Sequence, residues 1–340
     1  MRKHLKTIAL VLFTTAILWR LWRGLDWTEV RRSLSQASAL LIGLATAVSS
    51  VTLLLRAFRW RALLAPLAPV NTHDVFAATN IGIGSSFLFG AAVGELTRPL
   101  ALSLLRPQVR RAIAFLTIVV ERVCDICVLL VLFGLSLFWL PLYSGHVVAA
   151  AHAAKLGVVL ISLPFIVLAL LVLVNGRFGK NPDWLTESTA NWKSAANPVK
   201  RFALRVIHQL LRALTLLAKR RVLVIVTFWT AVQWLSVILT TWLVLRAFGM
   251  PFAIKETIFV MSCGLVGSFV PTPGGAAGAF HAALSSGLIF LGATLDQAAA
   301  ISIVAHLIGF VPALAFGSYY LLRSDLKVAQ LQHEMSAAVD

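Results

Sequence analysis

The chain consists of long apolar runs separated by short clusters of arginine and lysine. Most runs reach the length of about 20 residues that a helix needs to cross about 30 Å of hydrocarbon. The period-two alternation of barrel strands is absent, so we expect an all-α polytopic membrane protein that forms one membrane domain. After an N-terminal run, the apolar stretches lie at 37–55, 75–105, 112–142, 153–174, 222–245 and 254–322, the last being composite.

The N-terminal run, within residues 1–36, has thirteen residues between Lys6 and Arg20, which is the length of a signal peptide core. No small-residue cleavage site follows it. Trp19 and Trp22 lie at its end, where aromatic side chains anchor a helix at the membrane interface. The sequence therefore predicts a retained first helix followed by an outer loop.

The charged clusters indicate the topology, because cytoplasmic loops are enriched in lysine and arginine. Arginines follow both the run at 37–55 and the run at 75–105, so both ends of 75–105 should be cytoplasmic, which predicts a re-entrant hairpin. The loop 141–154 has no lysine or arginine and should be outside, whereas 176–221 is strongly basic and should be inside. The arginines in question are Arg56, Arg59, Arg61, Arg98, Arg106, Arg110 and Arg111.

Prolines within 254–322 predict a second hairpin of opposite direction. The roughly 15 residues that precede them cover only about 22 Å at about 1.5 Å each, too little for a comfortable crossing. A hairpin near 254–292 that enters from outside fits this length and leaves the tail 323–340, like the N-terminus, in the cytoplasm. The prediction is then about six spanning helices and two oppositely oriented re-entrant hairpins.

An internal repeat supports this layout. "LLLRAF" at 53–58 and "LVLRAF" at 243–248 agree at five of six positions, and each is expected to end the helix before a hairpin. We therefore expect two inverted units, 37–175 and 222–322. Inverted repeats with broken helices are typical of transporters, whose substrate site lies where those helices meet.

Composition excludes several other classes. The balance of 30 Lys and Arg against 13 Asp and Glu follows from the positive-inside rule and contact with anionic headgroups, and does not favour a nucleic-acid partner. In the basic loop, 199–217 is amphipathic and should lie on the membrane surface, as a binder of anionic lipid or a simple anchor. The three cysteines lie in apolar segments and indicate neither a disulfide nor a metal site. No nucleotide-binding loop is present, and no cofactor is indicated.

Charged residues inside the apolar runs are the main candidates for function, because each is costly at depth unless it is paired. Glu95 and Arg98 share a helix face, so they pair with each other or Arg98 binds a headgroup phosphate. Glu121 and Asp125 share another face beside Arg122 and need a further basic partner or a cavity; they carry protons or clamp two helices. The predicted headgroup site comprises Arg56, Arg59, Glu95, Arg98, Glu121, Arg122 and Asp125.

The segment "PTPGGAAGAF" at 271–280 is the most unusual stretch of the chain. Its prolines should end one half-helix, and its glycines free backbone N–H groups that could bind a phosphate; the alternative is a tight turn that permits close helix packing. His281 and His306 are spaced so that they could face one another and couple transport to protons, or each could simply hydrogen-bond to a neighbour. The residues singled out in this turn are Pro271, Pro273, Gly274, Gly275 and Gly278.

Four motifs together resemble one known family: "RAFRWRALL", "GELTRPLAL", "ERVCDI" and "PTPGGAAGAFHAAL". In order and spacing they are similar to the flippase-like membrane domain of the lysylphosphatidylglycerol synthases, over about 40–322. The resemblance implies a translocator of aminoacylated phosphatidylglycerol or related lipids, without the soluble synthase domain. Three positions depart from the family pattern, in which proline, glutamate and arginine are common where this chain has Gly90, His281 and His306.

The leading hypothesis is therefore a non-enzymatic lipid transporter of the bacterial inner membrane that passes a headgroup through a polar path. Its partners would be anionic or phosphate-bearing lipids, and the candidates are an aminoacyl or other anionic phospholipid, a polyprenyl phosphate and a hopanoid-type lipid. Two alternatives stay open: an integral-membrane lipid-modifying enzyme, although no HxxxH or DxxDxxxD pattern is present, and a non-transporting subunit of a lipid or envelope pathway.

Overall fold

The computed structural model describes residues 19, 23–89, 91–138, 147–178, 220–270 and 273–323. Within these ranges the chain forms ten helices and no strand, which confirms the all-α polytopic membrane fold. The predicted N-terminal helix, the amphipathic segment 199–217 and the tail after 323 lie outside the described residues. The helices are α2 (Trp27–Gln36), α3 (Ala39–Leu64), α4 (Thr72–Phe89), α5 (Ala91–Leu105), α6 (Arg111–Leu137), α8 (Val147–Phe178), α11 (Arg220–Ala247), α12 (Ile254–Gly267), α13 (Pro273–Phe290) and α14 (Leu295–Arg323).

Three of the described helices, α3, α11 and α14, are long and apolar enough to cross a membrane on length and composition alone. Two more have the length, since α6 has 27 residues and α8 has 32. At about 1.5 Å per residue both exceed the hydrocarbon thickness of about 30 Å. In α6 the apolar sequence is interrupted by three charged residues, Glu121, Arg122 and Asp125.

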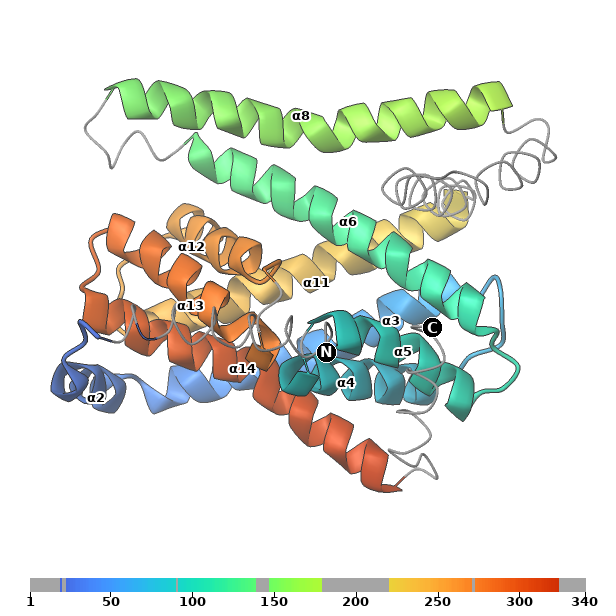
Figure 1. The fold of residues 1–340 in the computed structure, drawn as a ribbon, viewed down its shortest axis with the longest axis horizontal. Helices are drawn as coiled ribbons and strands as arrows, with labels where there is room; N and C mark the ends of the chain where they lie inside the picture. The colour runs from blue at the N-terminus through green and yellow to red at the C-terminus, as the bar shows by residue number, and fades with distance from the viewer. Residues whose placement is uncertain are drawn as a thin grey trace, which may run out of the picture.

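Two pairs of shorter helices form hairpins at the predicted places. Helices α4 and α5 pack along each other on either side of position 90, and α12 and α13 do so on either side of 271–272. In Figure 1 the open end of the α4–α5 hairpin lies on the right, that of the α12–α13 hairpin lies on the left, and both turns lie toward the middle. The two hairpins thus have opposite orientation, and their re-entry into a membrane stays a prediction.

The helix contacts follow two inverted units. Helix α3 runs alongside α11 in the opposite direction (Figure 1). Helix α4 packs against α14 as α12 packs against α6, and α5 contacts α6 as α13 contacts α14. Exchanging the helices of the first unit with those of the second maps these contacts onto one another, and the inverted repeat itself stays a prediction.

One detail of the predicted repeat is wrong. "LVLRAF" does end α11, at Ala247, but "LLLRAF" does not end α3, which continues to Leu64. No proline or glycine interrupts the segment after Phe58, and Arg59 and Trp60 are both almost fully buried within it. Arg59 therefore belongs to the interior of a helix, not to a cytoplasmic flank.

Glycines allow the helices of each hairpin to approach closely. A Cβ atom added at Gly94 of α5 would lie 1.7 Å from Ser86 Oγ and 2.4 Å from the carbonyl oxygen of Gly82, both on α4. A Cβ at Gly267 of α12 would lie 2.5 Å from the carbonyl oxygen of Ala279 on α13. Close approach of this kind is how membrane helices pack without a hydrophobic driving force.

Pro312 lies inside α14 and removes one backbone donor, so the carbonyl of Ile308 loses its helical partner. The hydroxyl of Ser49 on α3 donates to that carbonyl at 2.8 Å. This bond fixes α14 against α3 and gives a partner to a buried backbone group that the helix itself leaves unpaired.

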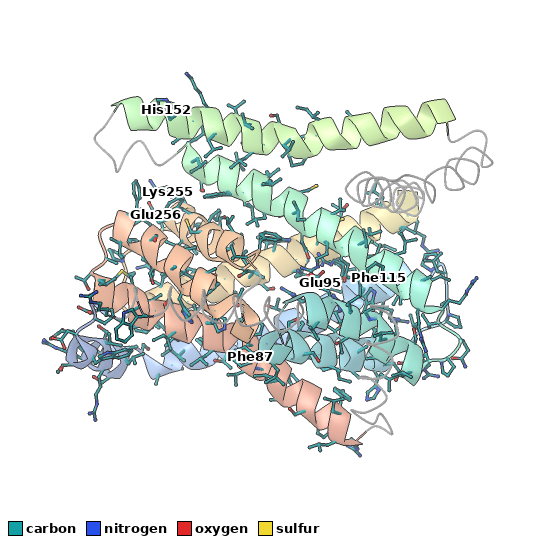
Figure 2. The ribbon with its side chains drawn as sticks, in the orientation of Figure 1. Phe87, Glu95, Phe115, His152, Lys255 and Glu256 are labelled. Carbon is teal, nitrogen blue, oxygen red and sulfur yellow. The ribbon has the colours of Figure 1, made fainter. Side chains whose placement is uncertain are left out.

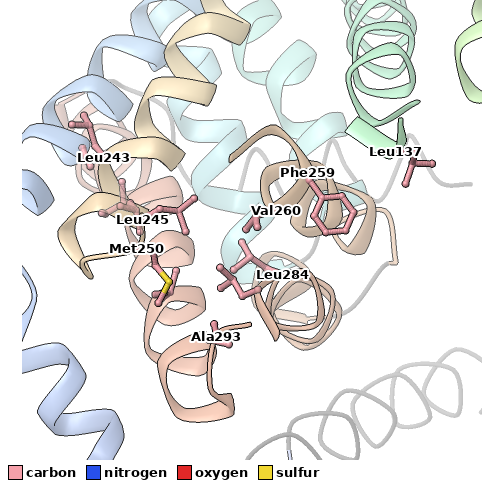
Figure 3. Packing of buried hydrophobic residues seen from close by; sticks show 14 residues of the cluster. Leu137, Leu243, Leu245, Met250, Phe259, Val260, Leu284 and Ala293 are labelled. Carbon is pink, nitrogen blue, oxygen red and sulfur yellow. The ribbon is translucent and has the colours of Figure 1, made fainter. Parts of the chain in front are cut away.

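The apolar core consists of two main clusters, each built mostly from one unit, and the cluster of the second unit also includes Ala45 of α3 and Leu137 of α6. Figure 3 shows the core of the second unit, where Leu245 of α11, Phe259 of α12, Leu284 of α13 and Ile301 of α14 belong to one buried cluster. The core of the first unit is a separate cluster centred on Trp60, and its remaining members come chiefly from α4, α5 and α6.

The described helix ends differ in charge. The ends of α3, α5 and α14 and the starts of α6 and α11, all on the right in Figure 1, carry seven arginines. Asp74 lies at the same side and pairs with Arg106. The positive-inside rule makes the right side cytoplasmic, and this assignment stays a prediction. The seven are Arg61, Arg106, Arg110, Arg111, Arg220, Arg221 and Arg323, whereas the left side carries a nearly balanced set, Arg23, Asp26, Glu29, Arg31, Arg32, Arg246, Lys255, Glu256 and Asp296.

Candidate functional site

Arg59 of α3 is the centre of a buried ionic cluster. Its side chain is 1% exposed and reaches two carboxylates of α6 that lie one helical turn apart. Nη1 and Nη2 donate to the two oxygens of Asp125 at 2.6 and 3.0 Å, and Nε donates to Glu121 Oε1 at 3.2 Å. The forked guanidinium thus joins α3 to α6 through three charge-assisted hydrogen bonds.

Arg98 enters the cluster from α5. Its Nη1 lies 2.9 Å from Glu121 Oε2, so Glu121 bridges Arg98 and Arg59. Its guanidinium carbon lies 4.4 Å from the centre of the Trp60 ring, and Nη2 is 3.4 Å from the hydroxyl of Thr79 on α4. Arg98 is therefore held by one carboxylate, one aromatic face and one hydroxyl.

The predicted pair of Glu95 with Arg98 is not formed. Glu95 instead lies 3.5 Å from Arg122 of α6, and Arg122 lies 3.8 Å from Asp125. Side chains three apart on a helix can pair, but Arg98 lies in the interior beside Glu121, whereas the Glu95 side chain is 45% exposed. Figure 2 shows Glu95 at the turn end of α5, on the side that faces α6. Glu95 and Arg122 form the accessible rim of the cluster.

Helix α11 contributes a neutral donor, since Trp234 Nε1 lies 3.3 Å from Asp125 Oδ1. Both oxygens of Asp125 are then engaged, one by Arg59 and Trp234 together and the other by Arg59. Arg56, one turn before Arg59 on α3, is only partly buried. The described residues offer Arg56 neither an ion-pair partner nor a hydrogen-bond acceptor within reach.

The cluster lies well inside the helices that carry it. Arg59 is five residues from the end of α3, and Asp125 is fourteen residues from the start of α6. These separations correspond to about 8 and 21 Å at 1.5 Å per residue. Charges at this depth are expensive and mark a functional site by default. The arrangement can bind a charged headgroup at the rim while the interior pairs hold the helices in place.

The second unit has a smaller polar group at the same place in its own architecture. His281 on α13 lies 3.0 Å from Ser302 Oγ on α14, and the rings of His281 and His306 are 4.9 Å apart. His281 is the ninth residue of its helix, as Arg98 is the eighth of α5, and both face the long helix that follows. The structure thus brings the two histidines together.

Aromatic rings surround His306. Phe87 from the end of α4 lies 5.7 Å away between ring centres, and Phe280 and Phe310 lie at 5.2 and 4.9 Å. Figure 2 shows Phe87 where the end of α4 meets α14. The histidine group is therefore enclosed by the tip of the opposite hairpin, and no described contact joins it to the arginine cluster.

The proline–glycine turn is described only in part. Pro271 lies outside the described residues, Pro273, Gly274 and Gly275 begin α13, and Gly278 is buried in it. Sequence reasoning missed Ala276, whose φ of 66° is in the left-handed region although it is not glycine. It also missed Thr79 and Trp234, because a neutral residue in an apolar helix gives no signal of its own. Among the described residues, no group of His, Cys, Asp and Glu could hold a metal ion.

A family model described as the lysylphosphatidylglycerol synthase TM region matches residues 7–317. The chain belongs to this family. No curated protein and no solved structure matches it. Membership confirms the resemblance drawn from the sequence motifs and gives an integral membrane protein with a membrane lipid-related function. Three of the four motifs, those that begin at Arg56, Gly94 and Glu121, supply the arginines and carboxylates of the cluster.

Proposed function

We propose that the protein moves a lipid between the leaflets of the bacterial cytoplasmic membrane. The observation that carries the proposal is the ionic cluster between the first hairpin, α3 and α6. Replacing buried ion pairs by apolar side chains is often neutral or stabilising, so such a cluster is poorly explained by stability alone. Ionisable groups at this depth, combined with inverted hairpins, are typical of transport pathways.

The path begins at the rim formed by Glu95 and Arg122, with side chains 45% and 34% exposed, and continues toward Arg98 and Glu121, which are almost fully buried. A headgroup phosphate can replace Glu121 at Arg98 while Glu121 keeps its contact with Arg59, so that neither the arginine nor the carboxylate is left unpaired. The acyl chains stay in the bilayer. The partner is a membrane lipid with an anionic or phosphate-bearing headgroup, and the chain acts as a transporter, not as an enzyme.

The histidine group is the proposed coupling element. His281 and His306 lie in ring contact, so a proton on one ring disfavours a proton on the other. Histidine is the side chain whose unperturbed change of charge lies nearest physiological pH, so these two rings are the candidates for taking up a proton. Because Phe87 of the first hairpin covers His306, a change of charge there acts on the tip of that hairpin.

The direct test is leaflet exchange by the purified protein alone in liposomes. Spin-labelled or fluorescent phosphatidylglycerol, phosphatidylethanolamine and a polyprenyl phosphate are offered with and without a pH gradient, and the lipids are recovered and analysed. We expect faster exchange than in empty vesicles and chemically unchanged lipid. Conversion of the lipid would identify an enzyme instead. Folded protein that exchanges none of these lipids would favour a non-transporting subunit.

Proton coupling is tested in the same vesicles with His281→Ala. We expect the variant to lose the effect of the pH gradient and to keep exchange without a gradient. An unchanged gradient effect in the folded variant would remove His281 from the coupling.

A further inference from the structure

The ionic cluster holds one more positive charge than its carboxylates neutralise. Arg59, Arg98 and Arg122 each lie within 4 Å of a carboxylate. The carboxylates are three in number, Glu95, Glu121 and Asp125, whereas Arg56 makes a fourth arginine. The surplus charge therefore resides at Arg56.

Among the residues that the structure describes, no carboxylate is free to neutralise the charge of Arg56. It lies eight residues before the end of α3, about 12 Å inside the helix end. The charges that act on it are one carboxylate, Asp125, and three arginines. Asp125 already accepts the fork of Arg59 and the indole N–H of Trp234. A partly exposed guanidinium in this position is accessible to an anion from outside the chain, which would neutralise it.

Helix α11 presents free polar groups at the same level. The hydroxyls of Thr52 and Ser236 are 2.9 Å apart, and the rings of Phe58 and Trp229 stack at 5.0 Å. This antiparallel register places Arg56 level with residues 230–233 of α11. Within that segment, Thr230 Oγ1 and Gln233 Oε1 are buried and have no hydrogen-bond partner. The hydroxyl of Thr230 can donate its hydrogen to a phosphate oxygen, whereas Gln233 can donate only through its amide nitrogen Nε2.

We propose that Arg56 binds the phosphate of a lipid with one net negative charge, a phosphodiester such as phosphatidylglycerol, with Thr230 and Gln233 beside it. The proposal rests on the lipid-transport function proposed above and names its substrate class. One phosphodiester charge balances the surplus of the cluster. An aminoacylated lipid adds ammonium groups next to three arginines, and like charges in contact disfavour binding. The site thus selects the anionic lipid over the cationic aminoacylated one.

The test is lipid binding by the full chain in detergent, measured as lipid retained in native mass spectrometry. The probes are phosphatidylglycerol, phosphatidylethanolamine, lysylphosphatidylglycerol and, as a soluble diester, dimethyl phosphate. The proteins are wild type, Arg56→Gln, Arg56→Lys and the matched control Arg61→Gln, whose exposed side chain lies on the same helix. We expect wild type to prefer phosphatidylglycerol, Arg56→Gln to bind it about tenfold or more weakly, and Arg56→Lys to recover part of the affinity.

Thermal unfolding shows whether a variant loses lipid binding because the site is changed or because the protein is destabilised. Arg56 forms no ion pair with the described residues and lies near three arginines, so Arg56→Gln should unfold at or above the temperature of Arg61→Gln. A marked loss of stability would contradict the assignment of Arg56 as the unpaired charge. Wild type that binds lysylphosphatidylglycerol more tightly than phosphatidylglycerol would overturn the substrate class. Dimethyl phosphate that competes as well as the lipid would show a site for soluble phosphate instead.

Failure of the site and failure of the transport function give different results. Phosphatidylglycerol binding that depends on Arg56, without leaflet exchange by wild type, would keep the site and reject transport. Leaflet exchange by wild type, with phosphatidylglycerol binding unchanged in Arg56→Gln, would keep transport and reject the site.

Discussion

Arg59→Gln tests whether the ionic cluster holds the helices together. The substitution removes a guanidinium that contacts Asp125 at 2.6 and 3.0 Å and Glu121 at 3.2 Å, with side chains 14% and 0% exposed. Removing one partner of a buried ion pair costs about 3–5 kcal/mol, because the other charge is left uncompensated. Glutamine keeps some hydrogen bonding, so we expect about 3 kcal/mol, which corresponds to a fall of about 4 °C in Tm for a chain of 340 residues.

The assay is thermal unfolding of the purified protein in one detergent, followed by intrinsic fluorescence. Arg61→Gln is the control, since its exposed guanidinium donates only to Thr72 Oγ1 at 3.1 Å and should matter by about 0.5 kcal/mol or less. Asp125→Asn added to Arg59→Gln should recover part of the loss, because the unpaired carboxylate is gone. If Arg59→Gln unfolds at the temperature of Arg61→Gln, the cluster does not stabilise the fold as described.

Three further substitutions test the packing. Gly94→Ala should cost about 1–3 kcal/mol, because the added methyl group forces α4 and α5 apart. The control Gly43→Ala, which has no atom within 4 Å of the added Cβ, should be neutral or stabilising. Equal effects of the two substitutions on thermal unfolding would contradict the close approach of α4 and α5. Ser49→Ala should cost about 1 kcal/mol in wild type, because the carbonyl of Ile308 loses its hydrogen bond. In a Pro312→Ala background the cost should be clearly smaller, because the restored backbone N–H of residue 312 donates to that carbonyl. Equal losses in this double-mutant cycle would refute the role of the Ser49 hydroxyl. Ala276→Gly should raise the free energy of unfolding by up to about 1 kcal/mol, since glycine adopts a φ of 66° without strain. A lower Tm in this variant would show that Ala276 is not strained.

The helices and hairpins could be predicted from the sequence because the length of an apolar run and the charges that flank it are properties of the local sequence. Arginines at both ends of 75–105 and the prolines near 271 predicted two hairpins, and both helical pairs are present. The end of α3 could not be predicted, since the same arginines that suggested a flank are accommodated in the helix once Arg59 finds its carboxylates on α6. That contact depends on a helix more than sixty residues away.

The members of the site could be named from the sequence, but most of their pairing could not. Helical spacing indicated that Glu95 and Arg98 share a face, but it cannot show which neighbouring helix offers Arg98 a stronger partner than Glu95. Glu121 takes Arg98 because α6 packs against α5 at that level. The roles of Trp60 and Trp234 could not be predicted for another reason, since an aromatic residue in an apolar run is most simply explained as packing.

The central claim, that the ionic cluster carries a lipid headgroup, is tested most directly by leaflet exchange with Arg98→Ala. The variant is reconstituted beside wild type and Arg61→Gln at equal protein content, after its insertion and thermal unfolding have been checked. The account predicts that Arg98→Ala inserts but loses lipid exchange, while Arg61→Gln exchanges lipid at the wild-type rate. Wild-type exchange by a stably folded Arg98→Ala would contradict it.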